Sequence, residues 1–266
     1  MSSRWLSMLG RYVHVGYTLA VLIFLALPIL CVVVMSFAPG RYLVFPFRKA
    51  PTLDAFTEVL GTLAIRESIL VSLTISVAVT IVAVLFATAG ALAFVRHKFP
   101  GSGFYQKAIF LPVFFPQSVL GLGSLLWFNL LGIPLDWKTA AVAQLVWIAP
   151  IVTLIIAIQV FGYDPALERA ARDLGATRLV AFRRVTLPLL APGIFSGALF
   201  AFLLSWVNFP ISLFTSGVDT PVPVWLHTKM ALAYAPTAPA LGALIFGFSF
   251  VLLLIPFYLM YRQHKE

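Results

Sequence analysis

Long apolar stretches alternate with short polar segments along most of the sequence. Six of the apolar stretches reach the length of about 20 residues that a helix needs to cross a bilayer. They lie at about 17–37, 68–95, 107–131, 139–161, 193–214 and 240–261. This pattern predicts an all-α fold, a polytopic membrane helical bundle with six transmembrane helices, formed by a single domain over residues 1–266.

Prolines are expected to modify the later spans. Pro112 and Pro116 predict a helix that is kinked or broken near one end of the third span, and Pro150 is expected to interrupt the fourth. The first span is longer than a signal-peptide core and no convincing small-residue cleavage site follows it. We therefore expect a retained signal anchor with a cytoplasmic N-terminus.

The segment between the first two spans, residues 39–67, keeps a helical rhythm of its own. Its apolar residues recur at near-helical spacing, with charged residues off that face; they are Leu53, Phe56, Leu60 and Leu63. This pattern is typical of an amphipathic helix lying on the membrane surface, here on the outer side.

The segment 164–190 is the long polar interruption of the chain. Asp164 can cap a helix and Gly175 can end it. Between them, the apolar positions at i, i+3, i+4 and i+7 form one face; they are Leu167, Ala170, Ala171 and Leu174. A second short helix is predicted to begin at Thr177 and to end at Leu187-Pro188.

Charge and composition set the class of protein and its orientation. With 61% hydrophobic residues and a mean hydropathy of +1.02, the chain lacks the polar surface of a soluble globule. The net charge of +9 is scattered over loops, which argues against nucleic acid. Twelve of the 18 Lys and Arg lie on the side of the termini and segment 164–190, which predicts that both termini are cytoplasmic.

Several kinds of chemistry are missing from the sequence. All nine acidic residues and all four histidines fall outside the six spans, whereas proton- or sodium-driven carriers normally need such a group within the bilayer. No catalytic motif and no phosphate-binding loop is present. The single cysteine, Cys31, lies in an apolar run. We expect no catalytic residue, no metal site and no cofactor, and any active transport must draw its energy from another subunit.

A polar face on the fifth span is the clearest candidate for a substrate path. Its members recur at i, i+3, i+7 and i+10 beside Trp206; they are Ser205, Asn208, Ser212 and Thr215. Such a face can line a translocation path or supply hydrogen bonds between helices, and both interpretations stay open. For the isolated amides Asn129, Gln144 and Gln159, contact with another helix is the preferred interpretation.

Segment 164–190 also carries a family resemblance. It resembles the cytoplasmic "EAA" loop of type I ABC importer permeases, E-A-A, three residues, G, nine residues, I-x-L-P. The matching positions are Ala170, Ala171, Gly175, Val185, Leu187 and Pro188. At the place of the family glutamate the chain has Arg169, with Glu168 one residue earlier. Leu111-Pro112, Pro116, Ser205–Asn208 and Ser212–Gly217 further resemble the polyamine (spermidine/putrescine) branch.

The resemblance implies a type I ABC importer permease fold whose loop helix docks in a cleft of an ATPase subunit. The residues implied in this coupling are Glu168, Arg169, Ala170, Ala171, Asp173, Leu174 and Gly175. The substrate that the resemblance implies is a polyamine or a related small polar solute. That branch often carries acidic residues, the obvious partners of a polyamine ammonium, where this chain has Val207 and Asn208. Aminophosphonates, iron, thiamine and small amino-acid derivatives therefore stay open as substrates.

The implied partners are two ATP-binding subunits that hold ATP and Mg, a second and different permease chain, an extracytoplasmic substrate-binding protein and membrane lipid. The implied location is the bacterial inner membrane. The alternatives are a secondary carrier or membrane scaffold without ATPase coupling and, less well supported, a membrane enzyme.

Overall fold

The computed structural model describes residues 2–39, 50–96, 100–232 and 237–263, and it contains helices and no β-strand within these ranges. The helices are α1 (Ser2–Met35), α2 (Asp54–Gly61), α3 (Leu63–Arg96), α4 (Ser102–Ala108), the 3-10 helix η1 (Leu111–Phe114), α5 (Gln117–Leu130), α6 (Trp137–Phe161), α7 (Ala166–Asp173), α8 (Arg178–Ala181), the π-helix η2 (Phe182–Thr186), α9 (Leu187–Trp206), α10 (Pro210–Thr215), α11 (Val222–Leu232) and α12 (Ala238–Gln263). The all-α prediction is confirmed.

Five helices in the described ranges are long and apolar enough to cross a membrane. They include Val13–Met35, Leu63–Ala93, Trp137–Phe161, Arg178–Trp206 and Ala238–Ile255. The span expected at 107–131 is divided among α4, η1 and α5, and α5 has only 14 residues. Pro116, with ψ of 134°, separates η1 from α5, so the predicted break is confirmed. By length alone, therefore, five of the six expected spans are present.

Two expectations about prolines are wrong. Helix α6 continues through Pro150, which is buried in it, instead of being interrupted. The second short helix does not end at Leu187-Pro188, because helical structure continues from α8 through η2 into α9. Pro188 lies in the first turn of α9. Pro150 in α6 is packed against neighbouring helices, which is the situation in which membrane helices tolerate proline.

Helix α11 was not anticipated in the proline-rich segment 215–239. Its first turn is supported by a hydrogen bond from the backbone N–H of Trp225 to the carbonyl of Pro221 at 2.9 Å. Prolines at the start of a helix do not disrupt it, because the first N–H groups have no partner within the helix. Proline content was therefore a poor guide to the structure of this segment.

The chain groups into two compact units, residues 1–62 with 229–251 and residues 63–228 with 252–266. In the first unit, the ring of Phe37 lies 5.2 Å from that of Phe56 in α2, and Thr52 N–H donates to the carbonyl of Phe37 at 3.1 Å. The helix expected within 39–67 is thus present as α2. Residues 40–49 of that expectation lie outside the described residues.

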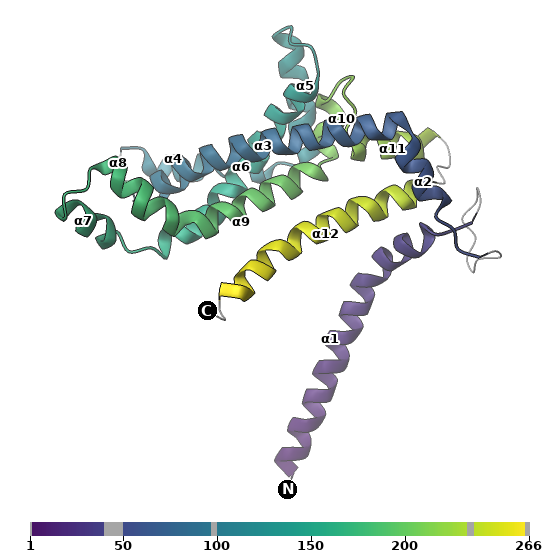
Figure 1. Cartoon of the computed structure of the whole chain (residues 1–266), viewed down its shortest axis with the longest axis horizontal. Helices are drawn as coiled ribbons and strands as arrows, with labels where there is room; N and C mark the ends of the chain where they lie inside the picture. The colour runs from purple at the N-terminus through teal and green to yellow at the C-terminus, as the bar shows by residue number, and fades with distance from the viewer. Residues whose placement is uncertain (1, 40–49, 97–99, 233–236, 264–266) are drawn as a thin grey trace. The chain divides into compact units, whose positions relative to one another are not determined.

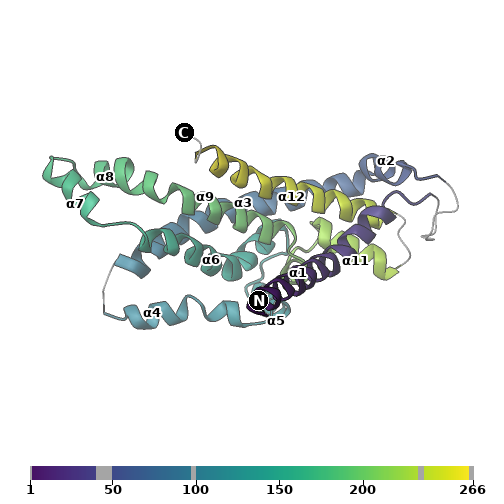
Figure 2. The same ribbon diagram turned by 90° about the horizontal axis from the view of Figure 1, so that it is seen from below.

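The second unit is built on α3, α6 and α9, which run side by side (Figure 1, Figure 2). Helix α3 buries every fourth residue along one face; these are Ile75, Val79, Ala83, Ala87 and Ala91. On α9, a Cβ added to Gly193 would lie 2.6 Å from Cβ of Gln159 in α6. Small side chains therefore allow these helices to approach closely, as is common between membrane helices.

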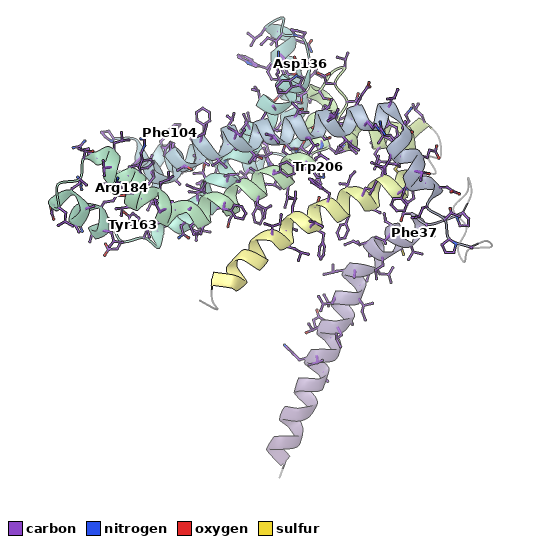
Figure 3. All side chains as sticks on the ribbon, in the orientation of Figure 1. Phe37, Phe104, Asp136, Tyr163, Arg184 and Trp206 are labelled. Carbon is purple, nitrogen blue, oxygen red and sulfur yellow. The ribbon has the colours of Figure 1, made fainter. Side chains whose placement is uncertain are left out.

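The second unit presents different elements at its two ends. Helices α7 and α8 lie at one end and α10 lies at the other (Figure 1). Tyr163 and Arg184 mark the first end and Asp136 lies towards the second (Figure 3). Each end carries one of the two candidate sites predicted from the sequence.

Candidate functional site

Local backbone interactions give segment 164–190 its helix–turn–helix form. The Asp164 carboxylate accepts a hydrogen bond from Ala166 N–H at 2.8 Å just before α7. After α7, Gly175 has φ of +90°, a left-handed conformation that glycine adopts easily. The hydroxyl of Thr177 accepts from Val180 N–H and caps α8. The predicted start, turn and second start of this segment are confirmed.

Helix α7 turns its apolar face outwards. The side chains of Leu167 and Leu174 are 49% and 90% exposed, and Ala170 is exposed as well. Among the other residues predicted to couple to an ATPase, Arg169, Asp173 and Gly175 are exposed, whereas Ala171 is half-buried. A helix normally buries its apolar stripe against its own protein. In α7 that stripe is left open.

Glu168 is the coupling candidate that faces the protein. Arg96 at the end of α3 donates from Nη1 to Oε1 of Glu168, and the hydroxyl of Thr186 at the end of η2 donates to the same oxygen. The guanidinium of Arg96 also lies over the ring of Tyr163, 4.3 Å from its centroid. One carboxylate therefore connects α7 with the ends of α3 and η2.

The sequence reasoning missed Arg96, Tyr163 and Thr186. Arg96 lies 72 residues before Glu168, and Thr186 lies 18 residues after it. No local spacing rule connects the three positions. The signal that the sequence offers is the basic residue Arg96 at the end of an apolar span, and the expected excess of basic residues on one side of the membrane already accounts for it.

The environment of this cluster favours the ionised form of Glu168. Burial opposes ionisation, but hydrogen bonds from Thr186 and Arg96 and the positive charge of Arg96 outweigh it, so the pKa of the Glu168 carboxyl lies below its ordinary value of 4.5. Burial raises the pKa of Tyr163 above 10.0. The pair of Arg96 and Glu168 is therefore charged at neutral pH.

A cavity of about 390 Å³ adjoins the cluster. Its lining combines three arginines and one carboxylate with apolar side chains; it is formed by Val95, Arg96, Val160, Phe161, Tyr163, Pro165, Glu168, Arg169 and Arg172. The cavity lies between α7 and the ends of α3 and α6. Beside it, the Glu168 side chain connects α7 to Arg96.

At the other end of the unit, the polar residues predicted on one face of the fifth span do not share a helix, because α9 ends at Trp206 and α10 begins at Pro210. The single-helix prediction is wrong, but these residues take part in a buried hydrogen-bond network. The side chain of Gln144 in α6 donates to Ser212 in α10 at 2.9 Å and accepts from Ser205 in α9 at 2.5 Å. All three residues are at most 4% exposed. Gln144 therefore joins three helices, and its predicted contact with other helices is confirmed.

The network extends to α5 and to the start of α6. Asn208 donates to the side chain of Gln117 at 3.2 Å. The hydroxyl of Thr139 donates to the backbone carbonyl of Thr215 at 2.7 Å. The structure thus joins four of the five candidate path residues by hydrogen bonds; these are Ser205, Asn208, Ser212 and Thr215. The fifth, Trp206, is the last residue of α9 and is buried as well.

The other two isolated amides behave differently from each other. Gln159 in α6 donates to the carbonyl of Leu189 in α9 at 3.1 Å, as predicted for a contact between helices. Asn129 is exposed and donates to the carbonyl of Leu125 in its own helix at 3.0 Å, so the prediction is wrong there. An asparagine side chain in a helix can donate to the backbone carbonyl four residues earlier, so it needs no partner helix.

In the part of the chain that the structure describes, no group of three or more His, Cys, Asp or Glu could hold a metal ion.

Comparisons with known proteins agree with this arrangement. Residues 85–265 match the family described as binding-protein-dependent transport system inner membrane component. The chain is 32% identical over 251 residues to the putrescine transport system permease protein PotI of Escherichia coli (strain K12), covering 91% of this chain and 89% of that protein. It is 25% identical over 248 residues to the spermidine/putrescine transport system permease protein PotC of the same strain, covering 93% of each.

A solved structure shows the same fold. The crystal structure of a bacterial ABC transporter involved in the import of the acidic polysaccharide alginate has a chain that matches with a TM-score of 0.69 over 98% of both chains, at 16% sequence identity. The resemblance inferred from segment 164–190 is thus confirmed. The chain belongs to the family of binding-protein-dependent transport system inner membrane components, and it is a multi-pass permease subunit of an ABC importer and not an enzyme.

Proposed function

We propose that this permease contributes one part of the translocation path of an ATP-driven importer and that α7 is the surface on which a separate cytoplasmic ATPase acts. The observation that carries the proposal is the exposed apolar face of α7, with Leu174 at 90% exposure, on a short helix fixed between two capped turns. An exposed apolar stripe on an ordered helix is typical of a surface that a partner covers.

The coupling residues in this proposal are those of the α7 segment. Leu167 and Leu174 supply apolar contact, and Arg169 and Asp173 supply polar contact at its edge. Gly175 supplies the turn that sets the angle between α7 and α8. ATP and Mg are held by two ATPase subunits, which leaves this chain without a cofactor, and both termini lie on the cytoplasmic side with α7.

The translocation path in this proposal follows the neutral network around Gln144. Hydroxyl and amide side chains can both donate and accept hydrogen bonds, which suits a small polar solute. A second, different permease chain completes the path, and an extracytoplasmic binding protein delivers the solute. The relation to PotI and PotC supports a polyamine as the substrate.

Affinity purification from the native membrane tests the ATPase coupling. The tagged chain is purified in mild detergent, and co-purifying proteins are identified by mass spectrometry. We expect an ATPase and a second permease with the wild type, and loss of the ATPase with Leu174→Glu. Val218→Glu is the matched control, because Val218 is 88% exposed at a position outside segment 164–190. Recovery of the wild-type chain alone would favour the secondary-carrier or scaffold alternative.

Uptake of radiolabelled putrescine tests the substrate. We expect ATP-dependent uptake that requires this chain and disappears with Leu174→Glu. If an ATPase co-purifies but neither putrescine nor spermidine is taken up, the permease assignment stands and the polyamine proposal is wrong.

A further inference from the structure

The cluster around Glu168 connects three elements through one carboxylate oxygen. Arg96 reaches Oε1 from the last residue of α3, and Thr186 reaches it from the last residue of η2. Glu168 itself lies in the first turn of α7. These contacts are charge-assisted hydrogen bonds, which are stronger and more directional than contacts between neutral groups.

The cluster is shielded from water more than its charges would suggest. The side chains of Arg96 and Glu168 are 14% and 25% exposed, and Thr186 is 1% exposed. Nε and Nη2 of Arg96 are buried and have no hydrogen-bond partner among the described residues. The Arg96 charge therefore depends on the single contact with Glu168 and on the Tyr163 ring, so the pair resists separation.

The exposed apolar face of α7 lies on a different side of the helix from Glu168. The apolar face that carries Leu167, Ala170 and Leu174 is exposed, whereas Glu168 points to the protein. Within α7, positions 168 and 170 are about 160° apart around the axis, from the 100° turn per residue that 3.6 residues per turn implies. Helix α7 is thus held on one side and open for docking on the other.

We propose that Arg96 and Glu168 are positioning residues that pass the movement of α7 to α3 and, through Thr186, to α9. This inference rests on the proposed function, in which an ATPase moves α7. It assigns Glu168 to the inner side of the coupling helix, where it contacts the permease itself, and it adds Arg96 and Thr186 to the residues on which coupling depends.

The continuity of α9 explains how such a movement reaches the path. Thr186 is followed directly by α9, whose 20 residues span about 30 Å at 1.5 Å per residue. The last turn of α9 contains Ser205 and Trp206, two of the candidate path residues. A displacement of Thr186 along the helix axis is therefore carried to the neutral network without any intervening loop.

The test follows one reporter position in the assembled transporter, reconstituted in liposomes with its ATPase. Cys31 is the only cysteine of the chain, so Cys31→Ser gives a background in which Val207→Cys is the only thiol of this subunit. Val207 follows α9 directly and is 51% exposed. The rate of thiol labelling is measured with and without ATP and Mg, together with ATP hydrolysis.

With Glu168 and Arg96 intact, we expect ATP to change the labelling rate of Val207→Cys. In Glu168→Gln and Arg96→Gln, the ATPase stays bound and hydrolyses ATP, but the ATP-dependent change falls at least about fivefold, the lower end of ordinary allosteric coupling. Arg184→Gln is the matched control, because Arg184 is an exposed arginine in the same segment. It should leave the labelling response unchanged.

A double variant separates positioning from stability. Arg96→Met with Glu168→Leu removes the pair without leaving a buried charge, so the fold should be as stable as the wild type, yet the labelling response should stay lost. A restored response would overturn the proposal and make the pair merely structural.

Loss of ATPase binding in Glu168→Gln would also overturn the proposal, because Glu168 would then be a docking residue. A wild-type chain that binds the ATPase but shows no response at position 207 would overturn it as well, whereas a wild-type chain that binds no ATPase contradicts the proposed function itself.

Discussion

Polar side chains connect the helices at both ends of the α3–α6–α9 bundle, but the chemistry of these connections differs. At the α10 end, Gln144, Ser205 and Ser212 join three helices through neutral hydrogen bonds and are almost completely buried. At the α7 end, Arg96 and Glu168 join two elements through opposite charges and stay partly exposed. Both arrangements connect helices that are distant in the sequence.

Desolvation explains why charged side chains lie near the ends of the bundle, as Asp136 and Asp219 also do at the α10 end, whereas its interior is neutral. Removing an ion from water costs several kcal/mol even when a partner is present, whereas a neutral amide loses far less if its hydrogen bonds are made. Arg96 is the last residue of α3 and Glu168 lies in a loop helix, so each still reaches water. Gln144 lies within a membrane-length helix. The comparison teaches that neutral polar side chains are allowed within the bundle, whereas charged ones lie near its ends.

The strongest way to break this comparison is to place a charge in the neutral network. Gln144→Glu introduces a carboxylate at a position that is 1% exposed, and we expect the free energy of unfolding to fall by about 3–5 kcal/mol, the usual cost of an unpaired buried charge. The measurement is thermal unfolding in detergent at about pH 7. Gln159→Glu is the matched control, since Gln159 is half-buried, and it should cost clearly less. Equal costs at the two positions would contradict the explanation by desolvation.

Removing the amide without adding charge should have a smaller effect. Gln144→Leu deprives Ser205 and Ser212 of their partner, and we expect a loss of about 1–3 kcal/mol in the free energy of unfolding. Thermal unfolding in the same detergent measures it. Asn129→Leu is the comparison variant, because Asn129 is exposed and bonds only within its own helix. A loss for Asn129→Leu as large as that for Gln144→Leu would show that the network adds no stability.

The turn at Gly175 provides a test at the α7 end of the bundle. Gly175 has φ of +90° and no heavy atom within 4 Å of a Cβ placed there, so Gly175→Val strains the backbone by about 1–2 kcal/mol without a clash. We expect the chain to stay in the membrane but to lose ATP-driven putrescine uptake. Gly175→Asn, which tolerates the left-handed conformation better, should keep more of the uptake. Normal uptake by the valine variant would show that the angle of the turn is unimportant.

The smallest expected effect is the pH dependence of the charged pair. The pKa of Glu168 is lower in the folded chain than its ordinary 4.5, so its contribution to stability is present above that value and is lost as the pH falls through the folded pKa. The difference in unfolding temperature between the wild type and Glu168→Gln should be constant around pH 7 and shrink below 4.5. A difference that grows on acidification would mean that the pKa of Glu168 is raised.

The sequence by itself determined the features that depend on neighbouring residues. Length and hydropathy place the apolar spans, and the spacing from Asp164 to Gly175 places α7 and its turn, because helix periodicity, capping and left-handed glycine are local properties. The same locality identified the family through segment 164–190, before any contact between distant residues was known.

Only the tertiary structure decided which face of each element meets which partner. Arg96 and Glu168 are 72 residues apart and Ser205 and Gln144 are 61 apart, and no periodic pattern connects such positions. The sequence predicted a docking surface on α7 but not that Glu168 points away from it. It also expected Pro150 to interrupt a helix that packing keeps intact. Helix periodicity repeats every few residues and says nothing about partners, so the pairing of polar side chains is settled by how the helices pack.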